Sequence, residues 1–381
     1  MTSRERMAAA MGLVKPDRVP LMCQPSWGFV LGQLPAIDPV HLWHNKDRIY
    51  PRAFCDISRK FHFDGVLIPA VGLAPLDEGK VRSFNSDFPE GPHIVFASGD
   101  SCTYCHDDLP RYYYRQSPEA DIESFNPETI PEKLIYHPPS RHLRMYLKED
   151  AAGRVSEIIQ TRQYTGNGMS VHGSMYSPED YLIDLLGADK AMMALLTHPD
   201  KCKEILMRFA HAVAGHVQEQ IDAGVDAMNL SAPWTGQNFI SPQLYEEIIA
   251  PAQKVLADLC RKNDVICYCH TCGAIDDRLE LIIDIGFHGI ECLDPPPLGN
   301  VELEDAVRRI GHRAFIKGNI DPVNILRNGT VEEVRKDVLH RLETGMRAKG
   351  FILSTACSIA PGTPPENIDV LYEVVRKYGY Y

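Results

Sequence analysis

Three absences in the sequence exclude broad classes of protein. No run of about eighteen apolar residues occurs, so the sequence predicts no transmembrane helix, and the N-terminus lacks the apolar core of a secretory signal. Lys and Arg form no cluster, and a net charge of -12 disfavours a surface for nucleic-acid phosphates. We therefore expect a cytoplasmic protein that binds small molecules or another protein, with no nucleic acid and no membrane.

A disulfide framework is not indicated either. The 11 cysteines are an odd number spread along 381 residues, whereas disulfide frameworks are typical of short secreted chains. Hydrophobic residues make up 44% of the chain and charged residues 24%, which is ordinary for a soluble globular protein. Reduced thiols, some of them metal ligands, fit this composition better.

Helical and strand patterns alternate regularly after residue 177. Strands are predicted at 224–230, 265–270, 289–293, 314–318 and 351–354, and helices at 178–196, 199–223, 242–262, 276–285, 303–310, 331–348 and 365–377. Near the N-terminus we expect a helix at 2–11, a short strand after Pro20, a helix at 46–61 and a strand at 64–69. Parallel βα units of this number predict an α/β fold, a closed (β/α)8 TIM-type barrel, with residues 1–381 as a single domain.

The alternation breaks between residues 71 and 170. Strands are predicted there at 94–97, 111–115 and 154–164, and Pro-rich segments such as 117–139 separate them. We interpret residues 71–170 as an inserted excursion with β structure in the N-terminal half of the barrel.

The segment from Val265 to Gly273 carries the strongest chemical signal. His270 and Cys272 are two positions apart at a strand end, so an extended chain points both to one side. An imidazole and a thiolate there form half of a tetrahedral zinc site. Cys357 is the best further donor, because it also follows an apolar run. Buried cysteines often act as small hydrophobic core residues instead, and this is what we expect for Cys267 and Cys269 in the same strand.

The strand ends of a TIM-type barrel meet at one face, where catalytic groups lie. Glu291 and Asp294 are therefore candidates for a fourth zinc ligand or a proton donor. The alternative for these strand-end carboxylates is that they cap Asn300 and Val301 or meet solvent. Asn229 and Asn319 at the same face are candidates for substrate contact.

Aromatic residues near two strand ends suggest a substrate pocket. Trp27 and Phe29 follow the first predicted strand, and Trp234 lies in the loop after the strand at 224–230. Together they could form a flat apolar slot for an aromatic ring. A role in the hydrophobic core is the alternative for each tryptophan.

Several segments resemble the uroporphyrinogen decarboxylase superfamily. They are His270-Thr-Cys-Gly273, Gly318-Asn-Ile-Asp-Pro322, Cys357-Ser-Ile-Ala-Pro-Gly-Thr-Pro-Pro-Glu-Asn367, Arg4-Glu-Arg and Pro16-Asp-Arg-Val-Pro20. Within it, His-x-Cys with a distant Cys is similar to the zinc-dependent corrinoid methyltransferase branch. The resemblance implies Zn²⁺ at His270, Cys272 and Cys357. It also implies a corrinoid (cobalamin) supplied by a partner protein, because the Asp-x-His-x-x-Gly signature of cobalamin-binding modules is absent.

Uroporphyrinogen decarboxylases carry an Arg-Gln-Ala-Gly-Arg motif near the N-terminus that holds the acetate groups of the porphyrinogen. Residues 21–33 stand at the corresponding place and contain no Arg. A tetra-acidic substrate would lack its cationic clamp. The sequence therefore disfavours decarboxylation, which remains an alternative.

The sequence predicts a zinc-containing methyltransferase that moves a methyl group between a small substrate and the cobalt of a corrinoid protein. The aromatic slot favours a methoxylated aromatic and O-demethylation. A methylcobalamin:thiol methyltransferase of the coenzyme M type is the alternative. Outside the enzymes, a binding barrel stabilised by zinc is possible, but structural zinc sites more often have four ligands in close sequence pairs.

Overall fold

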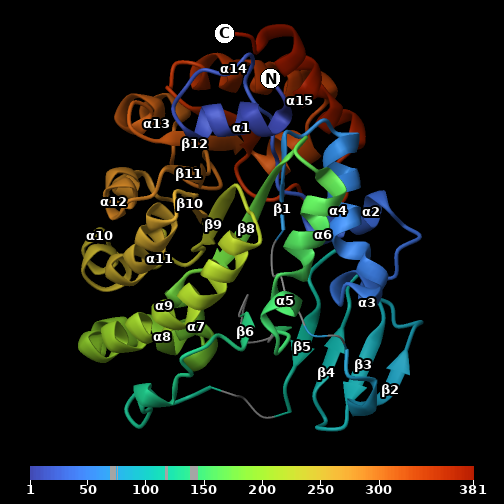
Figure 1. The fold of residues 1–381 in the computed structure, drawn as a ribbon, viewed down its shortest axis with the longest axis vertical. Helices are drawn as coiled ribbons and strands as arrows, with labels where there is room; N and C mark the ends of the chain where they lie inside the picture. The colour runs from blue at the N-terminus through green and yellow to red at the C-terminus, as the bar shows by residue number, and fades with distance from the viewer. Residues whose placement is uncertain (69–73, 75, 116–118, 138–144) are drawn as a thin grey trace.

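The chain folds into a barrel of parallel strands wrapped by helices (Figure 1). The computed structural model describes residues 1–68, 74, 76–115, 119–137 and 145–381. Its main sheet has seven parallel strands in the order β1-β8-β9-β10-β11-β12-β13. They are β1 (Gly65–Leu67), β8 (Ser170–Tyr176), β9 (Ala227–Ser231), β10 (Ile266–Thr271), β11 (Gly289–Cys292), β12 (Phe315–Ile320) and β13 (Phe351–Thr355).

An eighth extended segment, residues 20–25, joins the two edges of this sheet. On one side the Met22 N–H donates to the Leu353 carbonyl in β13 at 3.0 Å, and on the other the Asp64 N–H donates to the Leu21 carbonyl at 2.6 Å. Closure pairs the edge strands and leaves no open sheet edge. The predicted (β/α)8 TIM-type barrel is confirmed.

Helices cover the outside of the barrel (Figure 1). Those of the regular half are α7 (Pro178–Leu186), α8 (Ala188–Thr197), α9 (Pro199–Asp222), α10 (Pro242–Leu244), α11 (Ala250–Lys262), α12 (Leu279–Ile285), α13 (Leu303–Ile310), α14 (Val331–Gly345) and α15 (Pro365–Tyr378). The N-terminal half contributes α1 (Ser3–Met11), α2 (Trp27–Gln33), α3 (Pro39–Trp43), α4 (Ile49–Lys60), α5 (Ala151–Arg154) and α6 (Ser156–Thr165). None of the helices in the described ranges is long and apolar enough to cross a membrane.

Helix α1 seals the N-terminal end of the barrel. Its buried residues Met7, Ala10 and Met11 share one apolar cluster with side chains from the strands. The strand residues in that cluster include Ala227 and Phe315, which are the first residues of β9 and β12. With this end filled, the C-terminal end is the one that remains for a site.

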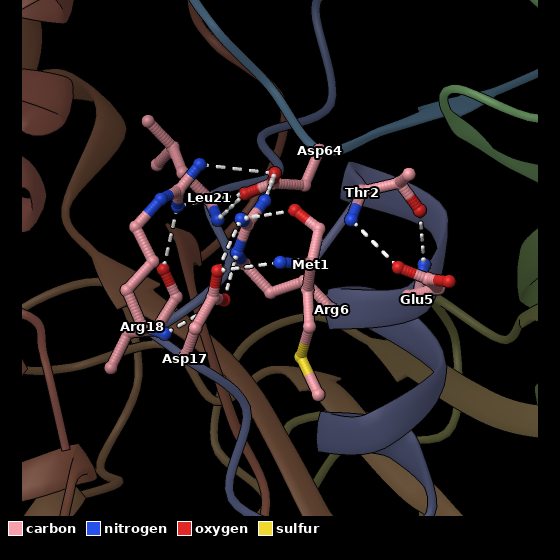
Figure 2. Close-up of polar contacts among 9 residues, drawn as sticks. Met1, Thr2, Glu5, Arg6, Asp17, Arg18, Leu21 and Asp64 are labelled. Atoms are coloured by element: carbon pink, nitrogen blue, oxygen red, sulfur yellow. Dashed lines mark hydrogen bonds and ion pairs between the residues drawn. The ribbon is translucent and has the colours of Figure 1, made fainter.

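Buried ion pairs fasten the sealed end (Figure 2). The Asp64 carboxylate, which is 0% exposed, accepts from Arg6 at 2.7 Å, from Arg18 at 3.0 Å and from the Leu21 N–H at 2.9 Å. Arg6 also donates to Asp17 at 2.7 Å and holds the pKa of that carboxyl well below its usual range. One carboxylate thus ties α1 and the closing segment to the start of β1.

The described part of the predicted insertion contains two small antiparallel sheets. One has four strands, β2 (Val81–Asn85), β3 (His93–Phe96), β4 (Ser101–Thr103) and β5 (Arg111–Tyr113), and the other pairs β6 (Tyr136–His137) with β7 (Met145–Tyr146). The larger sheet lies at the opposite end of the molecule from α1 (Figure 1). The strands predicted at 94–97 and 111–115 correspond to β3 and β5.

Two sequence-based assignments are wrong, and one barrel strand was missed. Residues 154–164 are helical instead of extended, because the buried Val155, Ile158 and Thr161 recur every three residues. The helix predicted at 178–196 is two helices, α7 and α8, which meet at Gly187 with φ 82°. Strand β8 was not predicted, because Ser, His and Gly replace the apolar residues that mark a buried strand.

Candidate metal centre

The structure brings His270, Cys272 and Cys357 together at the C-terminal end of the barrel. His270 lies in β10, Cys272 follows its last residue, and Cys357 follows β13. The Cys272 Sγ lies 3.4 Å from His270 Nε2 and 3.8 Å from Cys357 Sγ, although 85 residues separate the two cysteines. The Cys357 Sγ lies 4.0 Å from the same imidazole nitrogen.

These spacings suit zinc. A tetrahedral ion at about 2.3 Å from sulfur and about 2.0 Å from nitrogen holds its ligand atoms about 3.5–3.8 Å apart. The three measured separations, from 3.4 to 4.0 Å, bracket that range. Two sulfurs and one imidazole nitrogen are also the donor set that zinc prefers over magnesium or calcium. The side chains present therefore fit the ion without rearrangement of the backbone.

A fourth thiol belongs to the same cluster and was missed by the sequence analysis. Cys292 is the last residue of β11, and its Sγ lies within 4.8 Å of the ligand atoms of the other three residues. The strand-end rule led to its neighbours Glu291 and Asp294 instead. The position of Cys292 at a strand end was the available signal. Because neighbouring residues of a regular strand point to opposite faces, however, the side chain of Cys292 was expected to point away from that of Glu291.

The charge state of the cluster depends on burial and on mutual hydrogen bonds. Burial would lower the pKa of His270, but the adjacent Cys272 and Cys357 raise it well above its usual value. Hydrogen bonds from Cys272, Cys292 and His270 lower the pKa of Cys357 well below its usual value. Burial raises the pKa of Cys292 well above its usual value. Both shifts favour a thiolate at Cys357 beside a charged imidazole at His270.

Glu291 stands behind the imidazole of His270. Its Oε2 lies 3.2 Å from His270 Nδ1, close but not aligned as a hydrogen bond. The same oxygen accepts from Asn229 Nδ2 at 2.8 Å, and Oε1 accepts from Lys317 Nζ. Carboxylates that face the second nitrogen of a metal-binding histidine fix its tautomer and ring orientation.

Lys317 was not selected from the sequence, because it lies in the middle of β12 and not at its end. It is completely buried, and burial lowers its pKa to about 7. In the barrel interior it faces the Glu291 carboxylate and lies 6.0 Å from the centre of the Tyr268 ring. A buried cation beside a buried carboxylate limits the net charge beneath the thiols.

The other candidates at the strand ends have different surroundings. Asp294 Oδ2 accepts from the Gly273 N–H at 2.6 Å, whereas its buried Oδ1 has no hydrogen-bond partner in the described part of the chain. Burial raises the pKa of Asp294. Asn319 donates to the Leu293 carbonyl at 2.8 Å and accepts from Arg341 at 2.6 Å. Asn319 therefore connects loops, and Asp294 keeps one oxygen free to act.

The three aromatic candidates have different ring neighbours. Trp27 and Phe29 lie in α2 with 9% and 1% exposure. Trp27 packs at 4.8 Å from Trp43, and Phe29 at 5.9 Å from Phe61, so core packing accounts for both rings. Trp234 is half-buried and packs edge-on at 5.1 Å against Phe239, which is exposed. Only Trp234 keeps an accessible surface, and substrate contact by all three stays a prediction.

Comparisons with known proteins show which family the chain resembles. The family model for uroporphyrinogen decarboxylase (URO-D) matches residues 139–378. A methylcobamide:CoM methyltransferase MtbA of Methanosarcina acetivorans is 27% identical over 245 residues, which cover 61% of this chain and 66% of that relative. A uroporphyrinogen decarboxylase of Prochlorococcus marinus is 27% identical over 267 residues, covering 66% and 71%.

A solved structure agrees in fold along the whole chain. It is a methyltransferase from Methanosarcina mazei with a TM-score of 0.72 and 18% identity, covering 99% of both chains. The match to the MtbA relative spans somewhat less than two thirds of that protein's length, 66%. Since the family model covers more than half of this sequence, the chain belongs to the uroporphyrinogen decarboxylase family.

Proposed function

We propose that this protein is a zinc-dependent methyltransferase that moves a methyl group between a small substrate and the cobalt of a corrinoid carried by a partner protein. The observation that carries the proposal is the set of ligand-atom separations of 3.4–4.0 Å among His270, Cys272 and Cys357. Relatives named as methylcobamide:CoM methyltransferases support it.

The proposed roles follow from what each side chain contacts. His270, Cys272 and Cys357 would hold zinc, which supplies a Lewis acid for a substrate oxygen or sulfur. Glu291 already accepts hydrogen bonds from Asn229 and Lys317, so it orients the imidazole and does not transfer a proton. Asp294 is the better proton donor, because one of its buried oxygens is free of partners among the described residues.

For the substrate we propose a methoxylated aromatic compound. The Trp234 and Phe239 rings form an edge-on pair in the loop after β9. That loop lies against the metal centre, because the Gln237 N–H donates to the Ala274 carbonyl at 2.7 Å. An aromatic substrate could stack on the accessible face of Trp234. With this substrate the protein would carry out O-demethylation.

A thiol acceptor of the coenzyme M type is the second candidate. The names of the MtbA relatives favour it. Decarboxylation of uroporphyrinogen is the third, favoured by the Prochlorococcus relative and disfavoured by the absence of Arg from residues 21–33. A binding barrel in which zinc only stabilises the fold would bind metal without turnover.

An anaerobic assay separates these candidates. Protein with reduced cobalamin and a panel of methoxylated aromatics should give methylcobalamin, and protein with methylcobalamin and coenzyme M tests the thiol direction. Trp234→Ala should raise KM for an aromatic substrate several-fold and leave the thiol reaction unchanged, with Trp43→Phe as a control for a buried ring. Absence of methyl transfer in both directions would contradict the methyltransferase class.

A further inference from the structure

Cys292 faces the metal centre although the register of its strand directs it elsewhere. In the barrel sheet Glu291 pairs with His270 and Lys317, whereas Cys292 pairs with Thr271 and Gly318. Neighbours along a regular strand point to opposite faces. Glu291 lies against His270, yet the sulfur of Cys292 also lies within 4.8 Å of the ligand atoms of the cluster.

The backbone of Cys292 explains this placement. Its φ is 86°, and that of Leu293 is 56°, both in the left-handed region that L side chains rarely adopt. This conformation turns the side chain from the outer face toward the barrel mouth. The neighbouring strand accommodates it, since a Cβ on Gly318 would lie only 2.8 Å from the Cys292 carbonyl oxygen. Asn319 holds the next peptide by donating to the Leu293 carbonyl at 2.8 Å.

Hydrophobic packing does not account for the strain. Cys267 and Cys269, the fully buried thiols of β10, belong to the main hydrophobic core, and neither has a left-handed backbone. Cys292 is just as buried but belongs to neither hydrophobic cluster of the described residues. Residues with a strained backbone cluster at functional sites. The neighbouring side chains of His270, Cys272 and Cys357 indicate that Cys292 serves as a fourth ligand of the metal.

We propose that Cys292 is an exchangeable fourth ligand, which completes a Cys3His zinc site without substrate and leaves when a substrate atom binds. The proposal rests on the zinc of the proposed function. With the thiol acceptor of the second candidate function as substrate, the bond between Cys292 sulfur and zinc would break, a bond between the incoming sulfur and zinc would form, and the thiol proton would pass to Cys292. Charge and atoms balance without a further reactant.

Cys292 is the ligand best suited to leave. The Glu291 carboxylate lies 3.2 Å from His270 Nδ1 and fixes the orientation of that ring toward the metal, so His270 is not the ligand expected to leave. A released Cys292 becomes a neutral buried thiol, a state in which cysteine is stable. Relief of the left-handed backbone would favour release further.

X-ray absorption at the zinc edge of the full-length zinc-loaded protein counts the sulfur ligands. The proposal predicts three sulfurs and one nitrogen in the wild type and two sulfurs in Cys292→Ala. Cys267→Ala, which removes a buried thiol outside the cluster, should keep three. Two sulfurs in the wild type would overturn the proposal, and that measurement needs no variant to fold.

Exchange is tested by adding the selenol analogue of coenzyme M to the same wild-type sample. We expect one selenium, two sulfurs and one nitrogen around zinc. Three sulfurs with no selenium, or selenium in place of the nitrogen, would contradict the departure of Cys292. If wild type and Cys267→Ala bind no zinc, the proposed function itself fails, and this outcome differs from zinc held by two sulfurs.

Discussion

The two ends of the barrel bury carboxylates in opposite ways. At the N-terminal end, Asp64 accepts hydrogen bonds from Arg6 and Arg18. At the C-terminal end, after β8, Glu179 is fully buried with only Ser177 and Gln253 as hydrogen-bond partners among the described residues. Removal of one partner of a buried ion pair is strongly destabilising, and an unpaired buried charge costs stability in itself. One end therefore holds the barrel together, and the other retains polar groups and strain that suit chemistry.

The largest expected effect is loss of the metal centre without loss of the fold. Cys357→Ser removes one of two thiolates that lie 3.8 Å apart, so zinc and methyl transfer should both fall below detection. The sealed end is untouched, and the urea midpoint of the metal-free protein should match that of metal-free wild type. Metal analysis and urea unfolding measure the two effects. Full zinc occupancy in the variant would show that Cys357 is no ligand.

A substitution at the sealed end should have the converse effect. Asp64→Asn leaves the largely buried Arg18 without a carboxylate and the buried Arg6 with Asp17 alone, which should cost about 3–5 kcal/mol of unfolding free energy. Zinc content of the remaining folded protein should not change. Asp56→Asn is the control, because its ion pairs are exposed and should contribute under about 1 kcal/mol. Equal losses from both variants would refute the contrast between paired and exposed carboxylates.

Glu179 should reveal the cost of unpaired burial through pH. Burial raises its pKa from an ordinary 4.5 to about 7. Between these values the unfolded chain has released the proton that the folded chain retains, so stability falls as pH rises through this window. Glu179→Gln should reduce that slope and add about 1–3 kcal/mol above pH 7, while the adjacent buried Asp180, whose pKa is also raised by burial and by Glu179, keeps part of the slope. Thermal unfolding across pH 4–8 tests it, and an unchanged slope would mean that Glu179 is not buried unpaired.

A smaller effect is expected from the residue behind the imidazole. Glu291→Gln keeps the shape of the side chain but removes the charge that lies 3.2 Å from His270. Loss of such a partner weakens metal binding by about 10–100-fold. Competition with a chromogenic chelator measures the affinity, and Glu302→Gln, an exposed carboxylate in the loop that follows β11, should leave it unchanged. Unaltered affinity in Glu291→Gln would assign Glu291 to the fold alone.

Among the barrel strands, the sequence predicted those whose residues are apolar and missed β8, whose residues are largely polar. The strand segments that lead to His270 and Cys357 were recognised because their neighbours are apolar and β-forming. Strand β8 carries His172, whose Nδ1 shares a hydrogen bond of 2.9 Å with the Tyr268 hydroxyl inside the barrel. Polar residues at such interior positions make the strand resemble a loop in the sequence. Closure by residues 20–25 depends on long-range hydrogen bonds that no local pattern reveals.

The residues of the candidate site also fall into those that the sequence could predict and those that it could not. His270 and Cys272 could be predicted together because a strand places alternate residues on one side. Cys292 could not, because its left-handed backbone, with φ 86°, breaks that alternation. Lys317 was missed because only residues at the ends of strands were selected as candidates, and Lys317 lies in the middle of β12, inside the barrel. Local periodicity thus finds ligands on regular backbone, while strained or interior residues require the folded structure.

The most direct test of the account is the absorption spectrum of cobalamin during anaerobic turnover by zinc-loaded and chelated protein. Both samples receive the methyl donor and thiol panels, and a parallel sample receives uroporphyrinogen. We predict that the zinc form changes the methylation state of cobalt, that the chelated form does not, and that neither consumes uroporphyrinogen. Conversion of uroporphyrinogen to coproporphyrinogen by the chelated protein, with cobalamin unchanged, would contradict the account.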